Sequence, residues 1–159
     1  MTEMILSKPL PRWAFILSKF TAQALVYTVA FLVAEMFAYG YTVYLFESFS
    51  LAVFSWLNLL MLLWLLVFVA TTTLGSSIAR STGTAAGISL GIAVVILLSA
   101  QIPRYGTISP QALMVWAASL SPNMTFDLQT SNFSALAAAV VVIIMALVWA
   151  IGLFERQEI

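Results

Sequence analysis

Four long apolar stretches are the feature that most limits what this chain can fold into. They cover residues 20–44, 51–74, 83–102 and 135–154. Since a helix needs about 20 apolar residues to cross the hydrocarbon core of a bilayer, each stretch is long enough to span it. The residues do not alternate between apolar and polar, so strands of a membrane barrel are not predicted. We predict an all-α, polytopic transmembrane helix bundle of about four spans, forming a single domain over residues 1–159.

The composition agrees with a surface that faces lipid. Of the 159 residues, 63% are hydrophobic and 8% are charged, whereas an ordinary soluble domain has about 25% charged residues. Six basic and six acidic residues give a net charge of zero, and no basic patch indicates a nucleic-acid partner. Cysteine and histidine are both absent, which excludes metal sites built from those ligands. We therefore expect no metal and no other cofactor.

The basic residues predict the orientation of the bundle. Five of the six fall on one side of the membrane and one on the other. Those on the first side are Lys8, Arg12, Lys19, Arg80 and Arg156, and the exception is Arg104. Cytoplasmic loops carry an excess of lysine and arginine. The sequence therefore predicts a multi-pass protein of the cell inner (plasma) membrane with both termini in the cytoplasm.

A short apolar segment interrupts the predicted outer loop, residues 103–134. It covers residues 111–120, begins after Pro110 and ends before Pro122. Because it is too short to cross the bilayer, we expect a short outer helix that is re-entrant or lies at the membrane interface. A helix that caps the outer end of the bundle is the alternative.

The segment before the first apolar stretch, residues 1–19, mixes cations with aromatic and aliphatic residues. Pro9 and Pro11 interrupt any helix through its middle, and Trp13 and Phe15 stand between the basic residues. The pattern predicts an amphipathic segment at the inner membrane surface. A plain interfacial anchor, with cations that reach back to water, has the same pattern.

This segment resembles the cytoplasmic coupling region of type 2 ABC transporter permeases, which touches the ATPase subunit. The resemblance lies in L-S-K-P-x-x-R-W followed by K-F, and it continues in order along the chain. S-S-I-A-R-S-T-G-T-A-A-G-I-S-L-G is similar to the inner loop and the following small-residue helix of that family. A-S-L-S-P-N-M looks like its outer loop, and L-F-E-R-Q-E-I like its charged cytoplasmic end.

The resemblance implies a permease subunit that couples to a separate ATP-binding subunit and pairs with a second permease chain. The coupling residues that it implies are Lys8, Arg12, Trp13 and Phe15. Family members usually have about six spans, so this chain is similar to their C-terminal two-thirds. That difference leaves open whether the chain transports on its own.

Glu35 and Asn58 are the two polar residues of interest inside the predicted spans. Glu35 interrupts the first, at a cost of about 2.5–3.5 kcal/mol for a charged side chain at mid-membrane. It either faces a substrate path or a partner subunit, or it reaches the outer interface or a neighbouring helix. Asn58 in the second span is expected to form a hydrogen bond between helices.

Three glycines at the start of the third span are spaced four residues apart. Gly83, Gly87 and Gly91 therefore share one face of a helix, and a second backbone can approach such a face closely. We expect this face to pack inside the bundle rather than to form a dimer contact.

Two functions agree with these features. One is the permease subunit of an ABC-type transporter; the other is a non-transporting accessory or structural subunit of a larger membrane complex, derived from such a permease. The coupling-like segment favours the first, whereas the few polar residues in the spans favour the second. No phosphate-binding loop of the form G-x-x-x-x-G-K-[ST] is present, and we do not expect an enzyme.

Overall fold

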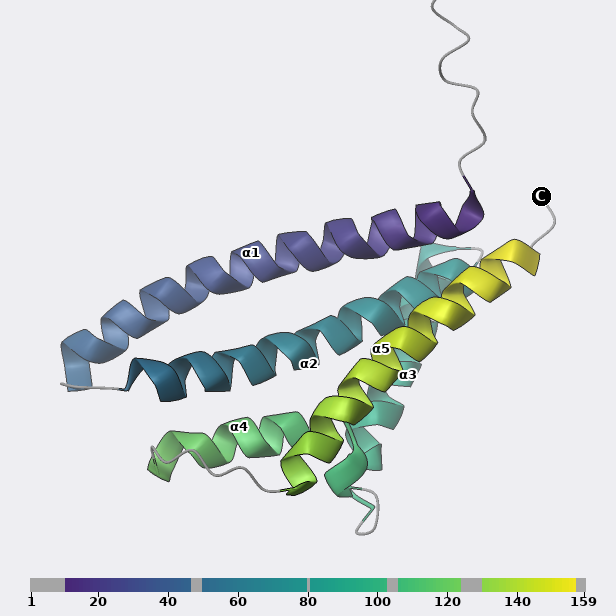
Figure 1. Cartoon of the computed structure of the whole chain (residues 1–159). Helices are drawn as coiled ribbons and strands as arrows, with labels where there is room; N and C mark the ends of the chain where they lie inside the picture. The colour runs from purple at the N-terminus through teal and green to yellow at the C-terminus, as the bar shows by residue number, and fades with distance from the viewer. Residues whose placement is uncertain (1–10, 47–49, 80, 103–105, 124–129, 157–159) are drawn as a thin grey trace, which may run out of the picture.

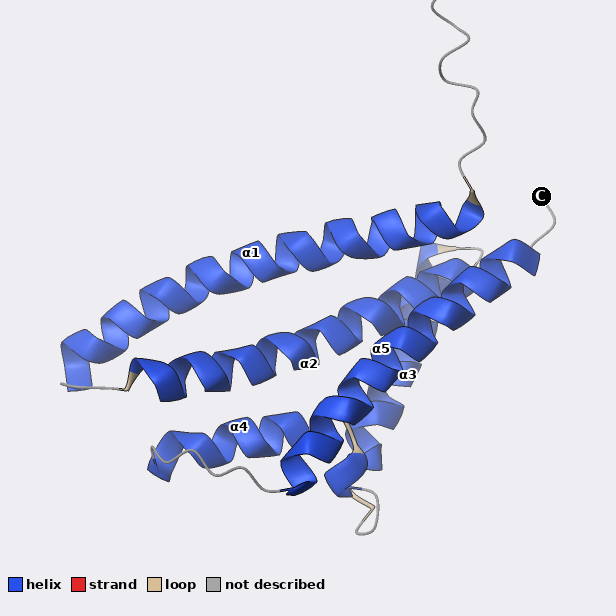
Figure 2. Cartoon of the chain, viewed as in Figure 1, coloured by secondary structure: helices blue, strands red, loops and turns tan. Residues whose placement is uncertain are grey.

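The structure is a computed structural model that describes residues 11–46, 50–79, 81–102, 106–123 and 130–156. These residues form helices without any strand (Figure 2). The elements are α1 (Arg12–Phe46), α2 (Leu51–Ile78), α3 (Thr82–Ser99), the 3-10 turn η1 (Gly106–Ile108), α4 (Ala112–Asn123) and α5 (Thr130–Arg156). The predicted all-α fold class is confirmed.

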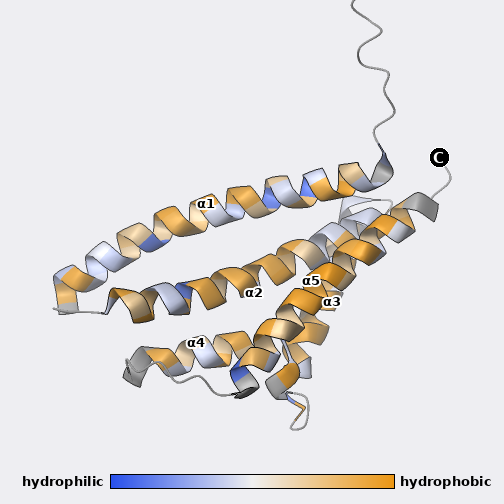
Figure 3. Cartoon of the chain, viewed as in Figure 1, coloured by the Kyte–Doolittle hydropathy of each residue, from blue (hydrophilic) through white to orange (hydrophobic). Residues whose placement is uncertain are grey.

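Four of these helices are long and apolar enough to cross a membrane. The qualifying ranges are Trp13–Leu45, Leu51–Ile78, Thr82–Ser99 and Asn132–Phe154, and hydrophobic residues dominate the middle of α2 and most of α5 (Figure 3). The prediction of about four spans is confirmed. The first helix begins at Arg12 rather than near residue 20, so no break separates the end of the coupling-like segment from the span.

Local chemistry explains where two of the helices begin. Pro11 directly precedes α1, where a proline does not disrupt helical hydrogen bonding, and its carbonyl accepts from the Ala14 amide at 2.9 Å. Ser81 caps α3: its side chain accepts from the Thr84 amide at 3.3 Å, while the Thr84 hydroxyl accepts from the Ser81 amide at 3.2 Å. This reciprocal pair satisfies amides that have no partner inside the helix.

α2 is the central helix of the bundle, and it contacts each of the other four α-helices. α1 and α2 run antiparallel, and the start of α1, the end of α2 and the end of α5 lie at the same end of the molecule (Figure 1). α5 faces α2 with a stripe of buried small residues, namely Ala135, Ala139, Ala146 and Ala150. Small residues let two helix backbones approach closely, which explains how α5 packs against α2.

The contact between α2 and α3 depends on Gly75 and not on the three glycines predicted for it. A Cβ at Gly75 would contact the Ser89 side chain and lie 3.2 Å from the Ser89 nitrogen and 3.3 Å from the Ala85 oxygen. Ala85 and Ser89 therefore face α2. The predicted glycine face occupies the opposite side of α3.

The prediction that Gly83, Gly87 and Gly91 pack inside the bundle is therefore wrong for this chain. All three are exposed, and a Cβ at any of them would meet nothing within 4 Å in the structure. The spacing correctly places the glycines on one face, but it does not say which face of α3 turns toward α2.

α4 lies lengthwise along the first half of α2 (Figure 1). Near its start, Gln111 Oε1 accepts a hydrogen bond from Trp64 Nε1 at 3.0 Å; one turn into α4, the Trp116 ring lies 6.3 Å from that of Trp56. α4 thus runs antiparallel to α2. The predicted short helix is confirmed, and it runs along α2 instead of crossing the end of the bundle.

Candidate functional site

The start of α1 contacts the end of α5. The ring of Phe15 stacks on that of Phe154 in α5, with 5.8 Å between centroids and 18° between planes. The next residue, Ile16, is 2% exposed. The first turn of α1 is therefore fixed to the last turns of α5, although the two segments are far apart in the sequence. We call this end of the molecule, formed by the first turns of α1 and the last turns of α5, the coupling end, after the coupling-like segment of the sequence.

Two polar pairs fix α1 to α2 further along the same end. Lys19 Nζ donates to Ser76 Oγ at 2.9 Å, and one turn later Thr73 Oγ1 donates to Gln23 Oε1 at 3.4 Å. Sequence reasoning missed both pairs. The available signal was the four-residue spacing of Lys19 and Gln23, which places them on one face of α1.

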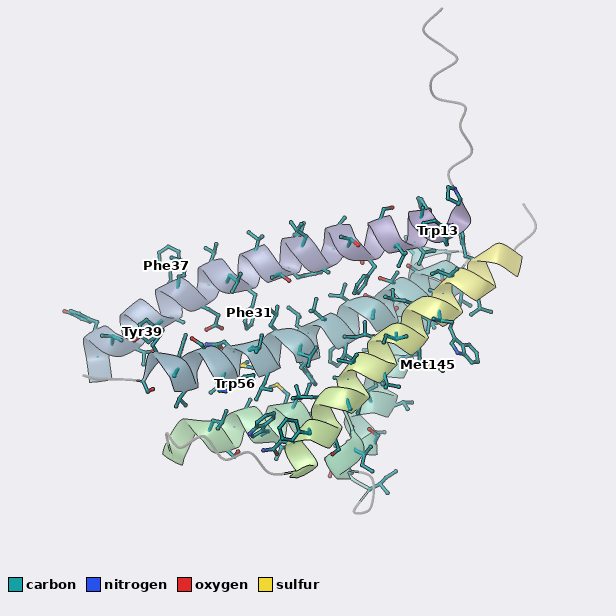
Figure 4. All side chains as sticks on the ribbon, viewed as in Figure 1. Trp13, Phe31, Phe37, Tyr39, Trp56 and Met145 are labelled. Atoms are coloured by element: carbon teal, nitrogen blue, oxygen red, sulfur yellow. The ribbon has the colours of Figure 1, made fainter. Side chains whose placement is uncertain are left out.

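The four residues predicted to couple to an ATPase have different surroundings in the structure. Lys8 lies outside the described residues, and Arg12 begins α1. Trp13 is 50% exposed at the coupling end (Figure 4), while Phe15 is 54% exposed and contacts Phe154. Residues two apart lie on nearly opposite sides of a helix. Trp13 and Phe15 therefore do not form one continuous docking face.

A groove of about 270 Å³ lies between the second half of α1 and the first half of α2, away from the coupling end. We call it the Glu35 groove. Its lining includes Phe31, Glu35, Tyr39, Phe54, Asn58 and Leu59. Phe31 and Tyr39 lie on the side of α1 that faces α2, and Phe37 lies on the other side (Figure 4). The structure thus brings together the two polar residues that the sequence singled out inside the spans.

The contacts inside the Glu35 groove correct one prediction. Asn58 Nδ2 donates to the carbonyl of Phe54, one turn earlier in the same helix, at 3.0 Å, rather than to a neighbouring helix as expected. The short amide side chain reaches its own backbone more easily than it reaches α1. The Phe54 ring lies 5.1 Å from that of Tyr39 at an angle of 53°, and this pair closes one part of the groove.

Carboxylates do not gather anywhere in the described part of the chain. No group of three or more metal-ligating side chains occurs there. Glu35 is therefore a single acidic group among apolar and aromatic neighbours. Its chemistry is that of a charge partner or a hydrogen-bond acceptor.

Comparisons with known proteins agree with this architecture. A family model described as ABC-2 family transporter protein matches residues 2–159. The chain is also similar to the uncharacterized transmembrane protein YxlG of Bacillus subtilis (strain 168), with 32% identity over 95 residues. That match covers 60% of this chain and 37% of YxlG, so the chain spans well under two thirds of its relative's length. No solved structure matches the chain.

The family match covers nearly the whole chain, and the order of its helices includes four that are able to span a membrane. The resemblance to type 2 ABC transporter permeases is thereby confirmed. This chain is a multi-pass membrane protein that belongs to the ABC-2 family of transporter proteins.

Proposed function

We propose that this chain is a membrane-spanning permease subunit of an ABC-type transporter, coupled to a separate ATP-binding subunit and paired with a second permease chain. The match of the ABC-2 family model over residues 2–159 carries the proposal. The sequence contains no phosphate-binding loop of the form G-x-x-x-x-G-K-[ST], which agrees with a separate ATP-binding subunit. The coupling end is the surface that supports such a contact.

The contacts of α1 suggest how a movement at the coupling end is transmitted to α2 and α5. Trp13 is exposed, whereas Ile16, only three residues later, is buried. Phe15 contacts α5 and Lys19 contacts α2. A partner that holds Trp13 would therefore act on both α5 and α2 through the first turns of α1.

Replacing Trp13 with alanine is expected to uncouple the ATPase. A buried aromatic anchor often contributes about 2 kcal/mol or more to an interface, so binding of the ATPase should weaken by roughly 30-fold. Arg12→Ala should weaken binding less, and mainly at low salt, because rim charges are screened. Binding can be measured by titrating the purified ATPase onto the chain in nanodiscs, together with ATP hydrolysis.

Trp149→Ala provides a matched control, because Trp149 is similarly exposed, at 58%, but belongs to α5. Its removal should leave ATPase binding unchanged. The proposal fails if the chain co-purifies only with membrane proteins that lack ATPase activity. That outcome would favour the accessory-subunit function instead.

We further propose that the coupling end faces the cytoplasm and that the membrane is the plasma membrane. Five of the six basic residues support this orientation. The native chain has no cysteine, so single cysteines introduced at Ser7, Ser48, Ser81 and Thr130 report on one position each. In intact cells an impermeant thiol reagent should label the Ser48 and Thr130 positions only. Labelling at Ser7 or Ser81 would contradict the orientation.

A further inference from the structure

Glu35 brings a single acidic group into the Glu35 groove, and no described residue pairs with it. In the ranges that the structure describes, Glu35 has neither an ion pair nor a hydrogen bond. Lys19, on the same helix, is held by Ser76 at the coupling end. A carboxylate in apolar surroundings is most stable when a cation pairs with it, so the groove favours a positively charged ligand.

The other walls of the groove suit the same kind of ligand. The rings of Phe31, Tyr39 and Phe54 line it, and aromatic faces attract ammonium groups. Its volume of about 270 Å³ is close to the lower end of the range for small-molecule sites, roughly 300–1,000 Å³. A head group with one amine and a few attached carbons fits such a space better than a bulky polar molecule does.

The depth of the groove indicates that its ligand comes from the bilayer. The rise along α1 from Lys19 to Glu35 is about 24 Å at about 1.5 Å per residue. The hydrocarbon core is about 30 Å thick, so a bundle with Lys19 at one edge of this core holds Glu35 inside the opposite edge. Exposed aliphatic side chains, Leu32 and Met36 on α1 and Leu59 on α2, belong to the same lining.

We propose that the Glu35 groove binds a lipophilic amine, an amphiphile whose ammonium group pairs with the Glu35 carboxylate while its hydrocarbon tail lies against Leu32, Met36 and Leu59. The ligand enters sideways from the bilayer. The site is distinct from the coupling end, and its occupation does not require ATP or the ATP-binding subunit.

The test uses the full chain in lipid nanodiscs, without an ATPase, and a dodecylamine probe that carries a photoreactive diazirine in its tail. After illumination, mass spectrometry should locate the label on the peptides of α1 and α2 that line the groove. Unlabelled dodecylamine should compete with the probe, whereas dodecanol, with the same tail and no charge, should not. Equal competition by dodecanol would overturn the proposal, because it would show that only apolar contact matters.

Substitutions at Glu35 and Leu59 test the carboxylate and the space separately. Glu35→Gln should reduce labelling about tenfold, the loss expected when a partly desolvated charge pair is removed, and Glu35→Asp should retain most of it. Leu59→Trp fills the groove without touching the charge and should also reduce labelling. Glu155→Gln, in the last turn of α5 at the coupling end, is the matched control and should label normally.

Unchanged labelling in Glu35→Gln or in Leu59→Trp would contradict the proposed site. If Glu35→Gln fails to fold, as judged by its helical circular dichroism and gel filtration, Leu59→Trp decides alone. Because no ATPase is present, these results are independent of whether the chain is a working permease subunit. A site that is confirmed here would stand even if the chain bound no ATPase.

Discussion

Replacing Gly75 with leucine is expected to disrupt the contact between α2 and α3 and to lower the free energy of unfolding by about 3 kcal/mol, the upper part of the range for overpacked sites. A Cβ at this position already lies 3.2 Å from a backbone nitrogen and 3.3 Å from a backbone oxygen of α3. A backbone cannot move aside as a flexible side chain can, so the two helices have to separate. Equilibrium unfolding in mixed detergent micelles, followed by circular dichroism, measures the loss.

Gly87→Leu is the matched control for this prediction. Gly87 lies on the exposed side of α3 and a Cβ there meets nothing within 4 Å. The same substitution should therefore leave the unfolding of the single chain unchanged within about 0.5 kcal/mol. A large loss at Gly87 together with a small loss at Gly75 would show that α3 is rotated relative to the arrangement described above.

Trp116→Ala is expected to be the most damaging change in α4, with a loss of about 3–5 kcal/mol in the free energy of unfolding. Trp116 is 5% exposed, beside Trp56 and within the same cluster as Leu60 and Leu113. Removing the indole leaves a large cavity between α2 and α4, and its lining loses dispersion contacts that lipid cannot replace. Faster amide hydrogen exchange in α4 should accompany the loss of stability.

Val115→Ala shows whether this effect comes from burial. Val115 neighbours Trp116 but is 66% exposed, so its truncation should change the unfolding free energy by less than about 0.5 kcal/mol. Equal effects of the two substitutions would mean that α4 does not pack on α2 through the face that contains Trp116.

The spans of this fold could be predicted from the sequence because hydropathy over about 20 residues is enough to recognise them. The start of α1 was harder to predict from the sequence. Lys19 suggested the end of a span, since lysine at a membrane edge usually reaches water. In the structure the helix continues past Lys19 to Arg12, and Lys19 donates a hydrogen bond to Ser76.

The packing faces could not be predicted in the same way. A helix in a soluble protein shows its core face as an apolar stripe, but lipid is as apolar as a packed leucine, and every side of these spans is apolar. Small residues therefore mark close approach without saying where it occurs. The glycine stripe of α3 proved to be exposed, while Gly75 and the alanine stripe of α5 provide the close contacts.

Each polar residue of the groove could be recognised in the sequence, because each interrupts an apolar stretch. Their proximity in one groove could not be predicted, since it depends on the register between α1 and α2. Lys19 with Ser76 and Gln23 with Thr73 fix that register near the coupling end. Such long-range pairs leave no periodic trace in a single sequence. For the same reason the stacking of Phe15 on Phe154 was not foreseen.

The unbroken length of α1 has a mechanical consequence. The helix has 35 residues and is about 50 Å long at about 1.5 Å per residue. If α1 turns as a rigid rod about its contacts with Phe154 and Ser76, Glu35 lies on its longer arm. A swing of about 5° around the held end moves the far tip by about 4 Å. A small displacement beside Trp13 would then be amplified at the far end of α1.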